Sequence, residues 1–419
     1  MIKALLRKYK SQLGDSAWSV CGLVLMNVVA QLVMFPLLRS TYGAQGYGDI
    51  QYLMAYVNMI TTTVGTAAGL TRMLLPAEAR ERNSGDYNLF LLGVALLGIP
   101  FALLVRSFGG VELDNATTVC YYLLFVAMAF RYYADFSYKI TLRYRRYFLY
   151  YLLIGAGYGV GIVLALKTNI WPLALLTGEA VGVLFAYAAE RNLRHRGLLP
   201  SAQLGAALRS IGLFCFSEGV SNMIQNADRV ILKTAVNADA VTVYYLATLV
   251  GKTMSLITVP LNGVAIGYLM RYDGKLTRRT MRWITLGSLI AIGSFTAVCV
   301  LGGYILLLWL YPDDMQSVYP FLWIGSLAQV FYFTTGFITV VLVRFAKKSY
   351  QIIINGAFGI CFFGIGIPAT VFGGLWGFAI AVVISNGIRW LIAVLLGYYH
   401  TLRDRCDRTD EVFHQNEVT

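Results

Sequence analysis

The sequence predicts an all-α protein that crosses a membrane many times. Of its 419 residues, 58% are hydrophobic and only 13% are charged, and the mean hydropathy is +0.64. A soluble domain could not bury so much apolar surface, so the composition excludes soluble enzymes and soluble binding modules. Two further observations support this class. Apolar stretches of membrane-spanning length recur along the whole chain, and the basic residues gather in alternate connections between these stretches.

Twelve stretches are apolar and long enough to be transmembrane helices, which need about 20 such residues. The first six lie at 17–38, 50–71, 89–108, 117–134, 148–166 and 170–189. The second six lie at 211–235, 241–269, 283–309, 321–343, 352–372 and 374–397. The longest connection between them, residues 190–210, divides the helices six and six. We therefore expect an N-terminal six-helix bundle at 1–200, a C-terminal six-helix bundle at 201–397 and a tail at 398–419.

The basic residues predict the orientation of the helices. Most of the 34 Lys and Arg residues lie before the first helix, after every second helix or in the tail, and the intervening loops carry about one each. Because cytoplasmic loops carry an excess of Lys and Arg, both termini should be cytoplasmic. The net charge of +13 is then explained by topology and by attraction to anionic lipid headgroups, so we expect no nucleic-acid partner.

Neither metal chemistry nor another cofactor is expected. The three histidines, His195, His400 and His414, all lie in predicted cytoplasmic segments, away from the membrane interior. The loops predicted outside the membrane are all short, so they offer no domain on which an enzyme active site could form. The glycines between Gly155 and Gly161 fall inside a predicted helix, where small residues allow close helix packing. The cluster of Tyr and Arg residues from Arg131 to Tyr151 is typical of an interfacial aromatic belt with a basic flank.

The stretch at 211–235 differs from the other predicted helices because it carries a polar stripe. At 100° per residue its polar side chains fall within about a third of the helix circumference. Each charge near the bilayer centre costs about 2.5 to 3.5 kcal/mol on insertion scales, so this face should line protein or water rather than lipid. The stripe comprises Glu218, Asn222, Gln225, Asn226 and Arg229.

Three regions of the sequence resemble polysaccharide biosynthesis flippases. Residues 32–88 have a helix ending near Pro36, a short Gly-x-x-x-Tyr-Gly loop at 43–48, a Gly-rich second helix and a charged loop. Residues 222–252 have an Asn followed by Asp228-Arg229 and then Tyr with small residues, and a Gly-containing link occurs at 372–377. The chain departs from the pattern at Val241-Thr242-Val243, where the family has a Gly-containing turn.

This resemblance is to the Wzx-type O-antigen and capsule flippases of the multidrug/oligosaccharidyl-lipid/polysaccharide (MOP) superfamily, which also contains multidrug and toxin extruders and peptidoglycan lipid flippases. It implies two six-helix bundles around a central cavity. It also implies a substrate, an oligosaccharide on undecaprenyl pyrophosphate, moved to the outer leaflet of a bacterial cytoplasmic (inner) membrane. The product would be lipopolysaccharide O antigen, capsule or exopolysaccharide. The implied partners are this lipid-linked glycan, membrane lipids and, as candidates, other polysaccharide assembly proteins.

Moving a pyrophosphate-linked sugar requires cations that hold phosphate and then release it. Arg229 and Lys252 suit that task, because Arg can bind phosphate oxygens bidentately and Lys acts as a compact point charge. The other candidates for binding the substrate are Arg389, Arg72, Asn222, Gln225, Asn226 and Asn58. Each has a structural alternative: buried ion pairs for Arg229 and Lys252, a helix contact for Asn58, and positive-inside bias for Arg72.

Energy coupling to H⁺ or Na⁺ would need a carboxyl group whose occupancy changes between states. Asp228, Glu218 and Glu179 are the candidates, because carboxyls in the membrane exchange protons readily. Asp228 points about 100° away from Arg229 and could instead contact a neighbouring helix. Glu179 could pair with Arg389 or neutralise another cation. Two rival functions remain at this point: a cation-coupled multidrug or metabolite antiporter of the same fold, and a membrane glycan polymerase or ligase.

Overall fold

The computed structural model describes residues 21–141, 143–195, 197–253, 276–346 and 349–416. These residues form helices joined by short connections, and no strand occurs among them. The chain divides into two compact units, Met1–Val230 and Ile231–Thr419. This division falls within a helix, thirty residues after the predicted boundary at residue 200, and the predicted domain limits stay a prediction.

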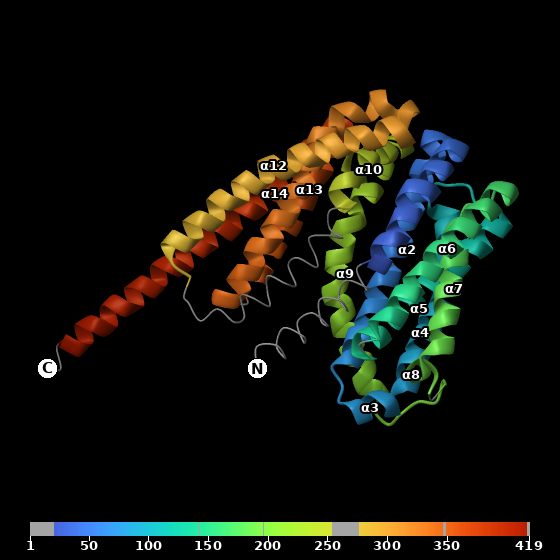
Figure 1. Cartoon of the computed structure of the whole chain (residues 1–419), viewed down its shortest axis with the longest axis horizontal. Coiled ribbons are helices and arrows are strands. Elements are labelled where there is room, and N and C mark those ends of the chain that lie inside the picture. Colours follow the sequence, from blue (N-terminus) through green and yellow to red (C-terminus); the bar gives the residue numbers. More distant parts are fainter. Residues whose placement is uncertain (1–20, 142, 196, 254–275, 347–348, 417–419) are drawn as a thin grey trace, which may run out of the picture. The chain divides into compact units, whose positions relative to one another are not determined.

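Unit 1 is a bundle of long helices that run alternately up and down (Figure 1). A π-helical turn, η1 (Ala30–Met34), precedes the first of them. The helices are α2 (Phe35–Met73), α3 (Ala77–Arg82), α4 (Ser84–Phe108), α5 (Asn115–Thr141), α6 (Tyr144–Thr168), α7 (Leu173–Ala189), α8 (Arg191–Arg194) and most of α9 (Leu204–Ala235). We call the end with α3 and α8 the Arg72 end, and the opposite end the Gly43 end.

Helix α2 is two helices joined by one residue. Gly43 has φ +71° and ψ −179°, a conformation that is strained for residues with a Cβ atom and easy for glycine. The helical residues before it, from Cys21 to Tyr42, correspond to the predicted helix 17–38, and the residues after it to the predicted helix 50–71. The loop expected between them is therefore a one-residue turn.

Glycines let α6 and α7 pack closely. A Cβ atom on Gly157 would lie 2.5 Å from Cα of Gly178, and one on Gly161 would lie 2.5 Å from the carbonyl oxygen of Leu173. Real Cβ atoms do not approach backbone this closely, so only glycine fits at these positions. The prediction that the glycines of this helix serve packing is confirmed at Gly157 and Gly161.

The connection between α8 and α9 is hydrogen-bonded to the start of α4. The buried carboxylate of Asp86 accepts hydrogen bonds from the backbone N–H and the hydroxyl of Ser201, both at 2.6 Å. The side-chain amide of Asn88 donates to the carbonyl oxygens of Leu193 and Gly197 at 2.9 and 2.8 Å. Gly85 lets the connection approach, because a Cβ atom there would overlap the carbonyl oxygen of Leu199.

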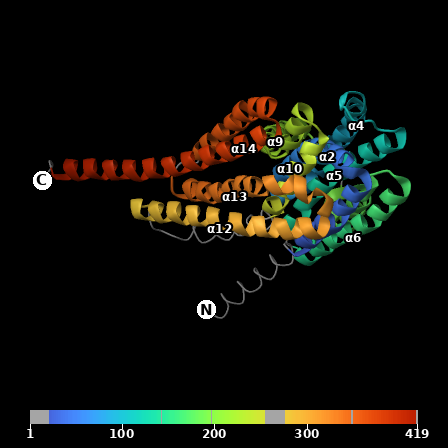
Figure 2. The same ribbon diagram turned by 90° about the horizontal axis from the view of Figure 1, so that it is seen from above.

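Unit 2 contains α10 (Ala238–Thr253), α12 (Arg278–Leu310), the 3₁₀ turn η2 (Pro312–Asp314), α13 (Met315–Phe345) and α14 (Ser349–Asn416). Helices α12, α13 and α14 run alongside one another, as both views show (Figure 2). Helix α14 turns sharply at Gly374, where φ is +57°, so it consists of two helices that match the predicted stretches 352–372 and 374–397. Their core includes Met281, Leu342 and Ala393, all fully buried.

The turn between α9 and α10 does not lie where the resemblance placed it. Helix α9 ends at Ala235 and α10 begins at Ala238, with the Asn237 side chain accepting a hydrogen bond from the backbone N–H of Ala240 at 2.8 Å. An Asn side chain can satisfy a free N–H at a helix start, so it serves where the family has glycine. Residues 241–243 are consequently inside α10.

Each of the twelve predicted stretches overlaps a helix of the described residues. Six helical segments in that part of the chain are long and apolar enough to cross a membrane, and two of them contain the turns at Gly43 and Gly374. Large apolar side chains such as Leu97, Trp309 and Phe372 are exposed on the helix surfaces, as expected for side chains that face lipid. The chain is therefore a multi-pass membrane protein.

Some predictions concern residues that the structure does not describe. The end of the predicted helix 241–269 lies outside the described residues. So do the basic residues of the N-terminal segment 1–20 and of 254–275, together with Lys347 and Lys348. The cytoplasmic location of both termini stays a prediction.

Candidate functional site

A buried ion pair lies inside unit 1. Glu179 of α7 is 2% exposed, and its Oε2 atom lies 3.6 Å from Nε of Arg131 on α5. Its other carboxylate oxygen accepts a hydrogen bond from the hydroxyl of Tyr158 on α6 at 2.5 Å. The guanidinium of Arg131 lies over the rings of Tyr132 and Tyr151, with its Cζ 4.5 and 5.6 Å from their centroids. Three helices thus enclose one acid and one base.

Tyrosine hydroxyls extend this network along α6. The Tyr151 hydroxyl donates to Oδ2 of Asp135 at 3.1 Å and lies 2.9 Å from the Tyr147 hydroxyl, and the Tyr150 hydroxyl donates to the carbonyl oxygen of Arg131 at 3.2 Å. Because Arg131, Tyr147, Tyr150 and Tyr151 are all buried, the interpretation of this cluster as an interfacial belt contacting lipid headgroups is wrong for these residues.

Sequence reasoning missed Arg131 because it counted this residue with the basic loop, although residue 131 falls within the predicted helix 117–134. Helix α5 continues to Thr141, so Arg131 lies well inside it. The signal that could have placed it is its position inside these predicted bounds. Glu179, a predicted coupling acid, has Arg131 as its ion-pair partner within unit 1, and its pairing with Arg389 of unit 2 stays a prediction.

Arg72 is held at the end of α2 by contacts with α3, α5 and α8 of unit 1. Its side chain is 0% exposed. Nη2 donates to the carbonyl oxygen of Asn192 at 2.6 Å and Nε to that of Arg80 at 3.3 Å, while Nη1 donates to the hydroxyl of Tyr133. The Phe136 ring stacks 4.8 Å from its Cζ. Arg72 also lines a cavity of about 250 Å³, whose other charged lining residues are Arg80, Arg143, Arg191, Glu81 and Glu190.

The polar stripe of α9 is partly used for contacts within unit 1. Asn222 is buried and donates from Nδ2 to the hydroxyl of Thr63 on α2 at 3.1 Å. Asn226 donates to the carbonyl oxygen of Asn222 at 2.9 Å, within its own helix. Gln225 is exposed and Glu218 is half-buried. Asn58 is half-buried on α2, within two turns of Thr63.

The neighbours Asp228 and Arg229 differ in burial. Asp228 is buried, and its Oδ1 accepts a hydrogen bond from the backbone N–H of Arg229 at 2.9 Å, while Arg229 itself is half-buried. In unit 2, Lys252 is half-buried on α10, with its Nζ 5.7 Å from the centroid of the Tyr245 ring. Tyr245 precedes Lys252 by seven residues, so the two share one face of the helix.

Arg389 is the buried cation of unit 2. It is 6% exposed on α14, and its Nη2 donates to Oδ1 of Asn355 at 3.0 Å. Nη1 donates to the carbonyl oxygen of Tyr332 at 3.4 Å. The rings of Tyr332 and Phe358 lie 4.4 and 5.1 Å from its Cζ. Each of these neighbours is neutral, which distinguishes Arg389 from Arg131.

Acidic residues are scarce near Arg389 in the described sequence. Between Leu276 and Leu402 the only acids are Asp313 and Asp314, at the start of α13. Tyr332 follows Asp314 by eighteen residues of helix, which at 1.5 Å per residue is about 27 Å. The remaining acid of α10, Asp239, lies in its first turn. Within the described residues of unit 2, the contacts of Arg389 are therefore polar and aromatic, with no carboxylate among them.

The described residues offer no grouping of three or more His, Cys, Asp or Glu side chains that could hold a metal ion. The predicted site residues fall into two sets. Those in unit 1 are Asn58, Arg72, Glu179, Glu218, Asn222, Gln225, Asn226, Asp228 and Arg229, and those in unit 2 are Lys252 and Arg389. Their roles in binding a substrate or an ion stay predictions.

No family profile and no curated protein matches the sequence. Solved structures do match. The chain is similar to the lipid II flippase MurJ in an inward closed conformation, with a TM-score of 0.72 at 12% identity, covering 91% of this chain and 87% of that one. It is also similar to an inward-facing multidrug resistance MATE family transporter of the MOP superfamily, with a TM-score of 0.64 at 14% identity, covering 90% and 94%.

A third solved structure is a MOP superfamily transporter from Pyrococcus furiosus. Its TM-score is 0.61 at 13% identity, and the match covers 92% of this chain and 94% of that one. At such low identity these similarities establish the fold alone. The chain therefore has the two-lobed, all-helical fold that MATE transporters and the MurJ flippase share.

Proposed function

We propose that this MOP-fold membrane protein is a flippase that moves a polyprenyl-pyrophosphate-linked oligosaccharide, on an undecaprenyl-type carrier, from the cytoplasmic to the outer leaflet by alternating access. The observation that carries the proposal is Arg389, a cation that is 6% exposed on a membrane helix and whose contacts among the described residues of unit 2 are all to neutral groups. The glycan would serve a surface polysaccharide such as O antigen, capsule or exopolysaccharide in a bacterial inner membrane.

A buried cation of this kind favours an anionic substrate. Ionisable residues inside a membrane are costly and usually face a partner or a hydrophilic pathway. The partners of Arg389, Asn355 and the Tyr332 carbonyl, orient the guanidinium without neutralising it. A pyrophosphate would supply the missing negative charge, and the planar guanidinium could bind two of its oxygens at once.

The other candidate cations fit the same chemistry. Arg229 and Lys252 are half-buried, so they remain accessible enough to exchange one anion for another. Lys252 can move its compact charge on a flexible stem, which favours release as well as binding. In this proposal Gln225, Asn226 and Asn58 hydrogen-bond the proximal sugars, and Arg72 contacts pyrophosphate as it enters from the basic end of unit 1.

A drug or metabolite antiporter on the same fold is the second candidate, and the similarity to MATE transporters favours it. Its cavity should be lined by acids to attract cations. For the Pyrococcus furiosus protein, a reversed polarity of the binding pocket suggests a different function. By the same reasoning, the basic character of Arg229, Lys252 and Arg389 favours an anionic cargo for this chain.

Coupling to H⁺ or Na⁺ forms part of the proposal. Glu179, Asp228 and Glu218 are the acids that could exchange an ion. Glu179 would have to separate from Arg131, 3.6 Å away, before it could do so, which makes the more exposed Glu218 the simpler candidate. No other cofactor is proposed.

The function is tested by the lipid-linked glycan pool of cells depleted of this protein. We expect polyprenyl-pyrophosphate glycan to accumulate on the cytoplasmic leaflet, which an impermeant glycan-modifying probe applied to oriented vesicles would detect. The same extract identifies the sugar by mass spectrometry. An unchanged pool, in a strain without a second transporter for the glycan, would contradict the flippase and favour the antiporter.

Replacing Arg389 by glutamine should slow flipping at least about tenfold, because a hydrogen bond to a charged group contributes about 1.5 to 3 kcal/mol and each 1.4 kcal/mol is a factor of ten. Arg389→Lys keeps the charge and should retain more activity than Arg389→Gln. The measurement is the initial rate of glycan flipping in proteoliposomes, normalised to folded protein.

Arg106→Gln is the matched control, because Arg106 is an exposed cation whose Nη1 contacts Asn115 at 2.6 Å. It should flip at the wild-type rate. Wild-type flipping by Arg389→Gln at normal expression would remove Arg389 from the proposed substrate pathway.

A further inference from the structure

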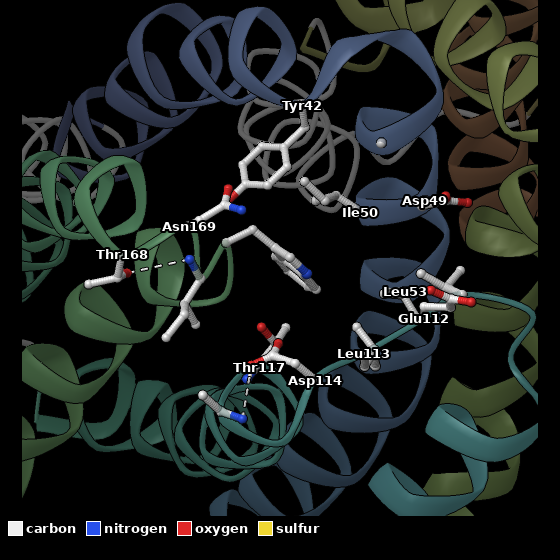
Figure 3. Close-up of a pocket in the computed structure, with 15 residues that line it drawn as sticks. Tyr42, Asp49, Ile50, Leu53, Glu112, Leu113, Asp114, Thr117, Thr168 and Asn169 are labelled. Atoms are coloured by element: carbon white, nitrogen blue, oxygen red, sulfur yellow. Dashed lines mark hydrogen bonds between the residues drawn. The ribbon is translucent and has the colours of Figure 1, made fainter.

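Unit 1 has a large cavity at its Gly43 end, far from the Arg72 end. Its volume is about 910 Å³, and it is formed by the turn of α2, the segment before α5 and the segment between α6 and α7 (Figure 3). Small-molecule sites in proteins usually measure about 300 to 1,000 Å³, so this cavity can hold a ligand of several rings. The distribution of basic residues predicts that this end faces away from the cytoplasm.

The cavity has the side chains that bind polyols. The Tyr42 ring and the Asn169 amide point toward each other on one side, and Asp114 and Thr117 lie across from them (Figure 3). Trp171, which is buried, and Ile170 add apolar surface. An aromatic ring beside amide, hydroxyl and carboxylate groups can pack against a sugar ring while hydrogen-bonding its hydroxyls.

The hydroxyl of Tyr42 supports a ligand here. It is buried, and it has no hydrogen-bond partner among the residues that the structure describes. Buried hydroxyls in proteins are almost always hydrogen-bonded, so an unsatisfied one beside a cavity marks a place where a water or a ligand group fits. A sugar hydroxyl could both donate to and accept from this phenol.

The charges around the cavity limit the class of ligand. Asp49, Glu112 and Asp114 are among its lining residues, and no Lys or Arg is. Hydrogen bonds from Thr117 and from the backbone N–H groups at the start of α5 lower the pKa of Asp114, so this carboxyl is ionised at neutral pH. Asp49 and Glu112 point away from Asp114, which excludes these three as a metal site (Figure 3).

We propose that this cavity is a glycan-binding site that accepts neutral or amino-substituted oligosaccharides and rejects acidic ones. The proposal rests on the proposed function and names the class of sugar that the flippase carries. The glycan would occupy the cavity at the outer face, where Tyr42 and Asn169 hydrogen-bond its hydroxyls. Carboxylate-bearing sugars are excluded because the lining acids repel them.

The test is a titration of the purified full chain in lipid nanodiscs with two trisaccharides of equal size, one of neutral N-acetylated hexoses and one containing hexuronic acid. Binding is followed by saturation-transfer NMR, which reports on the sugar. The neutral trisaccharide should bind and the acidic one should bind at least about tenfold more weakly.

Two variants remove one group each with little effect on the backbone. Tyr42→Phe deletes only the hydroxyl. Asn169 has φ +58°, so Asn169→Gly deletes the amide while keeping a backbone conformation that glycine adopts freely. Each should weaken binding of the neutral trisaccharide about three- to tenfold, the usual effect of one hydrogen bond. Tyr144→Phe makes the same chemical change at the start of α6, whose other end carries the lining residue Thr168, and should bind as the wild type does.

The proposal is overturned if the wild type binds neither sugar, if it binds the acidic sugar as tightly, or if both variants bind like the wild type. These outcomes differ from failure of the flippase itself. A lipid-linked glycan pool that does not change on depletion, together with binding of neutral sugars, would contradict flipping and leave the glycan site in place. Accumulation of the lipid-linked glycan pool, together with no binding of either trisaccharide, would support flipping and contradict the glycan site.

Discussion

Replacing Arg131 by methionine should lower the free energy of unfolding by about 3 to 5 kcal/mol, the usual effect of removing one partner of a buried ion pair. The loss arises because Glu179, which is 2% exposed, would keep a carboxylate in the bundle with only the Tyr158 hydroxyl to contact it. Thermal unfolding of the protein in detergent, followed by circular dichroism, measures the change as a lower midpoint.

The double variant Arg131→Met/Glu179→Leu distinguishes the pair from its separate side chains. Because it removes both charges, its stability should lie well above that of Arg131→Met and close to the wild type. The coupling free energy from the double-mutant cycle should therefore be large and favourable. If the loss of stability in the double variant equals the sum of the losses in Arg131→Met and Glu179→Leu, the assigned ion pair is contradicted.

The second large effect concerns Arg72. Arg72→Ala should destabilise unit 1 by about 3 kcal/mol or more, because it leaves the carbonyl oxygens of Asn192 and Arg80 without their donors and opens a void beside Phe136. Arg72→Lys should recover only part of this loss, since one ammonium group cannot reach all the acceptors of a planar guanidinium. The unfolding midpoint measures both effects.

Arg82→Lys is the matched control, because Arg82 lies on the neighbouring α3 and is exposed, and its unfolding midpoint should not change. Flipping by Arg72→Lys separates the two roles predicted for Arg72. If its role is structural, the rate per folded molecule stays at the wild-type value. If it binds pyrophosphate, that rate falls as well. A midpoint unchanged in Arg72→Ala would show that the recorded contacts contribute little.

The helices could be predicted from the sequence because apolar length and the basic loops are local signals. The turns could not be placed as well. At Gly43 the turn needs only one residue, because glycine adopts φ +71° without strain. The other residues of the predicted loop between 38 and 50 are therefore helical. At Asn237 the turn lies in the predicted gap between the stretches 211–235 and 241–269, and a capping side chain serves there in place of the glycine that the resemblance placed at 241–243.

The candidate site was harder to predict because partners of buried charges come from distant helices. The stripe on α9 was visible from its period, yet the Thr63 partner of Asn222 lies on α2, 159 residues earlier in the sequence. Arg131 was counted with the basic loop although it falls within the predicted helix 117–134, and its partner Glu179 lies on α7, 48 residues later. Glu179 and Arg389 each bind side chains of their own unit, Arg131 for Glu179 and Asn355 for Arg389, and neither partner could be read from the spacing along one helix.

The contact between Asp86 and Ser201 has a consequence for biosynthesis, because 115 residues separate the two. Translation at about 5 to 20 residues per second needs about 6 to 23 s to make that length of chain. During this interval the carboxylate of Asp86 lacks its two hydrogen-bond donors, the backbone N–H and the hydroxyl of Ser201. The N-terminal bundle therefore acquires its last contacts only when the ribosome reaches the start of α9. Its folding then overlaps in time with the synthesis of the second half of the chain.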